Sequence, residues 1–135
     1  MARWLFKEEP EHYSFADLQR DRTTIWDGVS NNLAQKNLRQ VKAGDRVLFY
    51  HTGKEKAVVG EMRVRIGPHP AEEGSKQVVV EVEAVGPLAR PVSLATIKDD
   101  PLLKDWDLVR LPRLSVMPVS TEQWRRIVEL SKLPD

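Results

Sequence analysis

The sequence predicts an α+β protein, built as a small mixed β-barrel of about five or six short strands with helices at its periphery. Runs of β-branched and aromatic residues recur between turn signals, which is typical of small β domains. Helix caps occur early in the chain and again near its end, without the regular strand–helix alternation of a parallel sheet. The 135 residues suffice for one hydrophobic core, so residues 1–135 are predicted to form a single domain.

The first half of the chain is predicted to alternate short strands with helices. Residues 3–7 form a first strand, and Ser14 then caps a helix that runs to about Asp21. Residues 23–26 are all β-formers and give a second strand. A polar helix follows over roughly residues 31–40.

The second half is predicted to be richer in strands, which pair mostly as antiparallel hairpins. A short polar turn joins residues 46–51 to residues 57–66, and the Gly- and Pro-rich residues 67–75 form a loop. Residues 76–85 give the clearest strand of the chain. The remaining predicted elements are a short helix capped by Ser93, a strand over residues 111–119 and a final helix capped by Ser120.

Composition excludes several classes of protein. The chain has no cysteine, which rules out thiol catalysis, cysteine-bound zinc and disulfides. It also lacks a run of about 18 apolar residues, so no membrane span is predicted and a cytoplasmic location is expected. The net charge is only +1, but residues 31–65 hold eight Lys or Arg against three Asp or Glu. This segment forms either a basic face for a phosphate backbone or an ordinary solvated surface.

Motifs for the common catalytic and metal-dependent chemistries are missing. No glycine-rich phosphate loop or serine nucleophile elbow occurs in the sequence. His12, His51 and His69 lack the spacing of metal ligands, so neither a metal nor a cofactor is predicted. Adjacent carboxylates such as Glu8-Glu9 point apart on a strand and do not form an acid–base pair.

Aromatic and amide side chains are the remaining candidates for a binding site. Trp26 ends a strand at the turn Asp27-Gly28, where a purely structural tryptophan is less expected than in mid-strand. We therefore predict that Trp26 forms the wall of a pocket and that its truncation disturbs little packing. A flat indole face can stack on a nucleobase, and Asn31 can offer a donor and an acceptor to a base edge. Trp4 is compatible with core packing or with the pocket.

Four blocks of the sequence resemble the EVE domain family in their order and spacing. They are "RWLFKEEPEHYSFADL", "TIWDGVSNNLAQKNLR", "VKAGDRVLFYHTGKEKAVVGEMRV" and "LPRLSVMPVSTEQW", and together they span nearly the whole chain. The resemblance implies a PUA-like barrel related to the YTH domains, which read methylated adenine in RNA. It also implies that one base, flipped out of its strand, lies in an aromatic pocket. With the aromatic candidate Trp4 and with Ser30 in the loop included, the predicted pocket residues are Trp4, Lys7, Trp26, Asp27, Val29, Ser30, Asn31, Tyr50 and His51.

Two stretches depart from the pattern of the family. Ser30 stands where many members have Arg, and Asn32-Leu33 stand where many have Tyr-Gln. Residues 67–70 read Gly-Pro-His-Pro in place of the common Tyr-Pro-Asp-Pro. These departures predict a ligand preference different from that of better-known members.

The resulting functional prediction is a non-enzymatic protein that binds a modified nucleobase in DNA or RNA. Phosphate contacts are expected from Lys36, Arg39, Lys42, Lys54 and Lys56. One alternative is a hydrolase of acylated cytidine like those of the ASCH domains, which share the barrel; Lys7 with Glu8 or Glu61 would then serve the reaction. Another alternative is a general RNA-binding module that uses the basic face and leaves the pocket empty.

Overall fold

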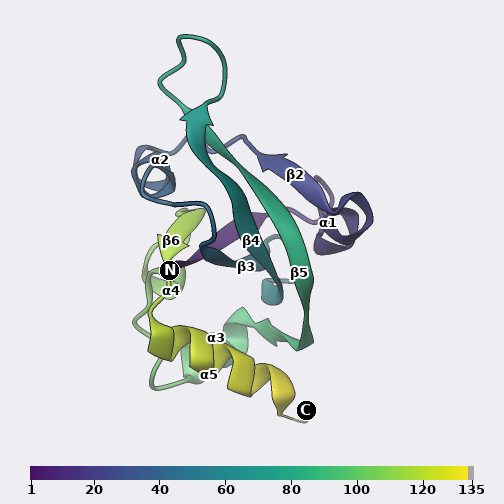
Figure 1. The fold of residues 1–135 in the computed structure, drawn as a ribbon. Helices are drawn as coiled ribbons and strands as arrows, with labels where there is room; N and C mark the ends of the chain where they lie inside the picture. Colours follow the sequence, from purple (N-terminus) through teal and green to yellow (C-terminus); the bar gives the residue numbers. More distant parts are fainter. Residues whose placement is uncertain (134–135) are drawn as a thin grey trace.

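The computed structural model describes residues 1–133 and contains one six-stranded sheet with five helices (Figure 1). Along the sheet the strands follow the order β2-β5-β4-β3-β1-β6. The strands are β1 (Arg3–Glu8), β2 (Thr23–Trp26), β3 (Arg46–His51), β4 (Ala57–Pro70), β5 (Val78–Ser93) and β6 (Val116–Pro118). The helices are α1 (Phe15–Asp21), α2 (Asn32–Leu38), α3 (Leu94–Asp99), α4 (Asp107–Arg110) and α5 (Thr121–Lys132).

Most neighbouring strands are antiparallel, as predicted, and β1 with β3 is the parallel exception among the strands described. A parallel pair needs a long crossover, because the chain must return to the same end of the sheet. Residues 9–45 provide it and carry α1, β2 and α2. The parallel register sets Lys7 beside Tyr50 and Glu8 beside His51. Two predicted site segments therefore come together at the carboxyl ends of β1 and β3.

The predicted barrel is not closed within residues 1–133, because β2 and β6 remain the two edges of the sheet. Helix α2 lies between β6 and the start of β5 and contacts both strands. Its Asn37 side chain donates to the carbonyl of Val116 in β6 at 2.8 Å. Its Gln35 side chain bonds both backbone groups of Val78 in β5. Side chains of a helix thus supply the connection that backbone pairing would supply in a closed barrel.

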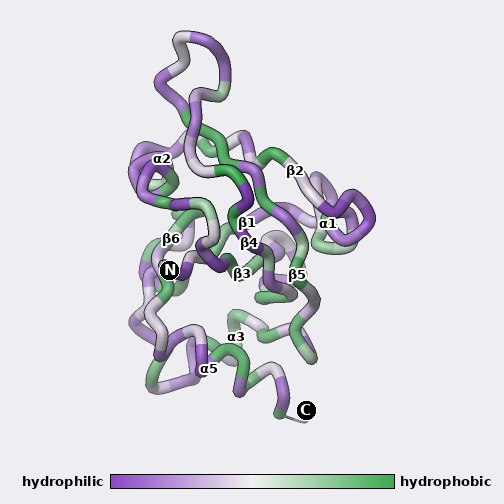
Figure 2. Tube along the Cα trace, in the orientation of Figure 1, coloured by the Kyte–Doolittle hydropathy of each residue, from purple (hydrophilic) through white to green (hydrophobic). Residues whose placement is uncertain are grey.

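The sheet is nevertheless strongly curled around an aromatic core. Strands β2 and β1 are separated by three other strands in the sheet order, yet the ring centroids of Trp26 in β2 and Phe6 in β1 are 5.5 Å apart. Phe49 of β3 meets the Trp26 ring edge to face at 5.3 Å. Hydrophobic residues accordingly gather along the central strands, whereas the loop that joins β4 to β5 is largely hydrophilic (Figure 2). Within the described residues no helix combines the length and apolar character needed to cross a membrane.

Three predicted segments differ from the structure. Residues 67–70, expected in a loop, continue β4 and pair with β5, where His69 stands opposite Val79. Several register shifts along this pair absorb the irregular Gly and Pro residues. Strand β5 itself continues past its predicted end to Ser93. The predicted strand over residues 111–119 contracts to β6, because residues 107–114 form α4 and turns.

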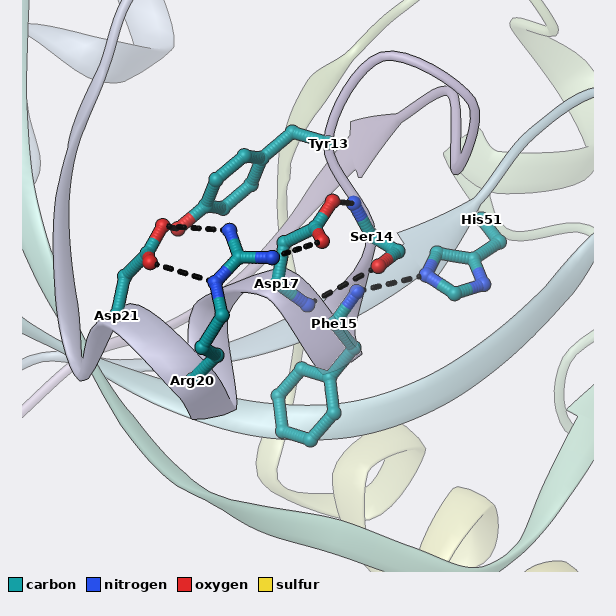
Figure 3. A network of polar contacts seen from close by, with 7 residues as sticks. All are labelled: Tyr13, Ser14, Phe15, Asp17, Arg20, Asp21 and His51. Atoms are coloured by element: carbon teal, nitrogen blue, oxygen red, sulfur yellow. Dashed lines mark hydrogen bonds and ion pairs between the residues drawn. The ribbon is translucent and has the colours of Figure 1, made fainter.

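Helix α1 is fixed to the sheet through its first residue, Phe15. The capping box of Ser14 and Asp17 is confirmed, and the Phe15 N–H donates to Nε2 of His51 at 3.0 Å (Figure 3). The Phe15 ring meets Phe49 edge to face at 5.4 Å and lies directly over Gly60 of β4. A Cβ atom on Gly60 would overlap this ring.

We expect Gly60→Ala to lower the free energy of unfolding by about 1–3 kcal/mol, because the new methyl group must displace the Phe15 ring. Gly86→Ala in the neighbouring strand is the matched control, since nothing lies within 4 Å of its added Cβ. Its effect should stay within about 0.5 kcal/mol. Denaturant unfolding measures both variants, and equal stability of the two would contradict the close packing of Phe15 on Gly60.

Candidate functional site

A cleft of about 290 Å³ opens where the carboxyl ends of β1 and β2 approach the segment before β6. Trp26 holds β2 in this position because its ring packs on Phe6 and Phe49. The cleft is lined by Lys7, Glu8, Glu9, Trp26, Asp27, Gly28, Val29, Thr52, Pro112, Arg113 and Ser115. Four of the nine predicted pocket residues therefore meet here, namely Lys7, Trp26, Asp27 and Val29.

Trp26 lines the cleft, but it is also a core residue. Only 4% of the residue is exposed, and both aromatic contacts described above involve its ring. The prediction that its truncation disturbs little packing is therefore wrong. A strand end is not a peripheral position here, because the sheet curls and brings that end against β1 and β3.

The loop after Trp26 is held by Gln35, which the sequence did not single out. The Gln35 side chain is 4% exposed, and its Nε2 donates to the carbonyls of Val29 at 2.6 Å and Val78 at 3.1 Å. Its Oε1 accepts from the Val78 N–H at 2.9 Å. Gly28 adopts a left-handed φ of 74°, which a residue with a side chain rarely takes. Gln35 and Gly28 together place Asp27 and Val29 on the cleft.

Lys7 connects the cleft wall to the segment before β6. Its ammonium group donates to the Pro112 carbonyl at 3.0 Å and lies 5.6 Å from the centroid of the Tyr50 ring. Its backbone N–H bonds to the Ser115 carbonyl at 2.9 Å. Burial disfavours the charged form and lowers the pKa of Lys7 below its usual value of 10.5. Lys7 thus presents hydrogen-bond donors to the cleft and also fixes one side of it.

Tyr50 and His51 are buried and do not line the cleft. Tyr50 is 3% exposed, and burial raises its pKa to about 12, so its hydroxyl is neutral under ordinary conditions. The Nε2 atom of His51 accepts the Phe15 N–H (Figure 3). The proton of a neutral ring therefore lies on Nδ1, which faces Glu55 at 2.8 Å. In this arrangement His51 fixes the start of α1.

The other predicted pocket residues are more dispersed. Trp4 lies in the core near the opposite end of β1, where its indole N–H donates to Asp45 at 2.9 Å, so the structure fits the core alternative. Asn31 uses its side-chain oxygen to cap α2 through the Ala34 N–H and lines a neighbouring groove. Ser30, which lies between Val29 and Asn31 in the chain, is exposed.

The predicted phosphate contacts are all exposed but do not form one patch around the cleft. Lys54 and Lys56 follow β3 in the turn beside Thr52, which lines the cleft. Lys42 precedes β3 and therefore lies near the opposite end of that strand. Lys36 and Arg39 belong to α2 and its end. Arg113 lines the cleft as a second cation besides Lys7 and was not named from the sequence, which predicts a strand over residues 111–119.

Charge is distributed unevenly around the cleft. Glu8, Glu9 and Asp27 supply three carboxylates, whereas Lys7 and Arg113 supply two cations. Glu61, a candidate for the hydrolase alternative, pairs through both oxygens with Arg46 at 2.9 and 3.0 Å and does not line the cleft. Among residues 1–133, no three His, Asp or Glu side chains gather in a way that could hold a metal ion.

Comparison with known proteins identifies the family. Residues 2–130 match the EVE domain, and the chain belongs to the EVE domain family. It is 29% identical to human thymocyte nuclear protein 1, over 97% of this chain and 74% of that protein. The rat protein of the same name is 30% identical over 96% of this chain and 73% of its own length.

Two solved structures are similar over the full length of both chains. Protein Atu2648 from Agrobacterium tumefaciens is 34% identical, with a TM-score of 0.92. Human THYN1 protein, crystallised in complex with 5-methylcytosine-containing DNA, is 27% identical, with a TM-score of 0.93. An ASCH protein from Zymomonas mobilis shares the fold at 14% identity and a TM-score of 0.60, over 96% of this chain and 95% of its own. The fold is consistent with the predicted PUA-like architecture, except that the sheet is not closed into a barrel within residues 1–133.

We expect Gln35→Leu to lower the free energy of unfolding by about 2–4 kcal/mol, because it leaves buried backbone groups of Val29 and Val78 without partners. Gln40→Leu makes the same chemical change at an exposed position and should have little effect. Denaturant unfolding measures both variants. Equal stability would show that the Gln35 bonds do not hold the loop.

We also expect the Lys7 amine to titrate below pH 10.5, because its environment disfavours the ammonium form. Reductive methylation with ¹³C-formaldehyde gives each lysine an NMR signal, and Lys7→Arg identifies the one that belongs to Lys7. Since the pKa is lower in the folded protein, the contribution of Lys7 to stability is full above pH 10.5 and falls as the pH drops through the folded value. Titration at or above 10.5 would contradict the burial of this amine.

Proposed function

We propose that this protein binds nucleic acid without catalysing a reaction and holds one modified base, with 5-methylcytosine as the leading candidate, in the cleft beside Trp26. The observation that carries the proposal is the joining of an aromatic wall, a hydrogen-bond donor and an acceptor in one small cleft. The DNA complex of the similar human protein supports nucleic acid as the partner.

The polar groups of the cleft match the edge of a cytosine. An ionised Asp27 only accepts hydrogen bonds, and a charged Lys7 only donates them. Cytosine offers an exocyclic amine as donor and a ring nitrogen and carbonyl as acceptors, so it can bind both side chains. Thymine carries a carbonyl in place of the amine and would face Asp27 with two lone pairs. A methyl group on the cytosine ring would gain contact with the apolar surfaces of Trp26 and Val29.

Access to this edge requires a base outside the duplex stack. Extrusion of a paired base costs a few kcal/mol. Stacking on one aromatic wall returns at most about 1–3 kcal/mol, because most of the Trp26 ring is already packed in the core. With three carboxylates at the cleft, electrostatic attraction contributes little to offset the difference. A single strand or a mismatched position is therefore the preferred substrate for binding.

We expect a single-stranded oligonucleotide with one central 5-methylcytosine to bind more tightly than the same strand with thymine there, because thymine lacks the amine that pairs with Asp27. Asp27→Ala should reduce this preference about tenfold or more, as expected for a hydrogen bond to a charged group. Asp99→Ala removes an exposed carboxylate from α3 and serves as the control. Fluorescence anisotropy with DNA and RNA versions of each strand measures the affinities.

Two results of this measurement would contradict the proposal. One is equal affinity of the unmutated protein for strands with 5-methylcytosine, cytosine and thymine, which would favour the general RNA-binding alternative if RNA binds best. The other is an unchanged preference in Asp27→Ala, which would show that the base does not bind in this cleft.

The hydrolase alternative rests on Lys7 and Glu8, which both line the cleft and of which Lys7 has a lowered pKa. Incubation with N4-acetylcytidine followed by mass spectrometry separates it from simple binding. An unchanged mass is the expected result, and loss of the acetyl group, absent in Lys7→Met, would establish the hydrolase.

A further inference from the structure

A second groove, of about 320 Å³, adjoins the cleft beside Trp26 and has a different character. We call the cleft beside Trp26 the base cleft. Its apolar surface comes from Leu33 at the first turn of α2 and from the turn that precedes β6. Its lining residues are Asn31, Leu33, Arg110, Leu111, Pro112, Arg113 and Leu114. Pro112 and Arg113 line both the groove and the base cleft, so the two sites share a wall. We call this second site the flanking groove.

The walls of the flanking groove are held in place. Asn31 caps α2 and so fixes the turn that carries Leu33. On the opposite side the Leu114 N–H bonds to the Leu111 carbonyl at 3.0 Å, and Lys7 holds the Pro112 carbonyl. Leu33 is nonetheless 44% exposed, although a leucine gains stability from burial. The groove is thus an ordered apolar surface left open to solvent.

The charges of the two sites differ in sign. The base cleft carries the carboxylates of Glu8, Glu9 and Asp27, whereas no residue that lines the flanking groove is acidic. Arg110 is paired with Asp107 at 2.6 Å, and no ion pair is found for the exposed Arg113 among residues 1–133. A phosphate group next to the held base is repelled on the carboxylate side and attracted on the Arg113 side.

We propose that the flanking groove receives the base next to the held one, and that Arg113 contacts the phosphate that joins the two nucleotides. This inference rests on the proposed function. The shared wall sets the groove next to the cleft, as the bases of neighbouring nucleotides lie next to each other in a strand. The apolar faces of Leu33, Leu111 and Pro112 suit the flat face of a base, and the guanidinium of Arg113 suits a phosphate. The protein therefore reads a dinucleotide unit rather than an isolated base.

The test uses single-stranded pentanucleotides with a central 5-methylcytosine. In two further probes, an abasic tetrahydrofuran replaces the neighbouring nucleotide on one side or on the other. For the unmutated protein, we expect one of these replacements to weaken binding about tenfold and the other to have little effect. In Leu33→Ala the same replacement should change affinity less than twofold, because the contact is already lost. Leu102→Ala, at a leucine that is 50% exposed elsewhere, is the control and should behave like the unmutated protein.

Salt dependence tests the role of Arg113 separately. Removing one phosphate contact to a single strand lowers the slope of log affinity against log salt by about 0.7. Arg113→Gln should show this decrease, whereas Arg90→Gln, in β5 and outside both sites, should not. An unchanged slope in Arg113→Gln would overturn the phosphate contact.

The outcomes separate this inference from the function on which it rests. If the protein prefers 5-methylcytosine to thymine but neither abasic probe binds more weakly, the proposed role of the flanking groove is wrong, whereas the proposed role of the base cleft is retained. If the protein shows no preference among the central bases, both proposals fall. If Leu33→Ala instead changes the sedimentation of the free protein, the groove is an interface between copies of this chain and the inference is overturned.

Discussion

The packing of Trp26 on Phe6 and Phe49 is the contact on which the rest of the structure depends. Strand β2 is an edge strand, and without this contact its end would lie far from β1 in an open sheet. The buried indole instead draws the edge across the core, curls the sheet and brings Asp27 beside Lys7. One side chain thus contributes to the hydrophobic core with one part of its surface and to the cleft with another.

The open sheet has a consequence for the site. Since β6 does not pair with β5, α2 connects β6 to the start of β5 through the side chains of Asn37 and Gln35. Gln35 also binds the Val29 carbonyl and so couples the loop at the cleft to the closure of the fold. The same helix presents Leu33 to the flanking groove. The region that replaces barrel closure is therefore the region that shapes both proposed subsites.

Charge gives the two subsites different roles. The carboxylates of the base cleft suit the amine of a base and disfavour phosphate, while Arg113 supplies a cation on the shared wall. In the binding mode that we propose, recognition depends on the edge of the base and on the direction in which the strand leaves the cleft. A net charge of only +1 fits this proposal, in which contacts to the base rather than broad electrostatic attraction select the ligand.

The sequence by itself determined the elements whose signals are local. The cap residues Ser14 and Ser120 begin α1 and α5 as predicted, and the β-formers of residues 23–26 form β2. The ordered blocks of the family pattern also determined the family. One of these blocks contains Trp26-Asp27-Gly28-Val29, and all four residues line the cleft. Such features depend on neighbours a few residues away, and the chain specifies them before it folds.

Only the tertiary structure decided which of these residues share a site. His51 and Trp4 carry the right chemical groups but are engaged by Phe15 and Asp45, partners that lie 36 and 41 residues away in the chain. Arg113 reaches the cleft because the chain before β6 folds into turns rather than a strand. Burial, the partners of buried polar groups and the curl of the sheet all depend on contacts between distant segments. No local pattern encodes them, and so the cleft became visible only with the fold.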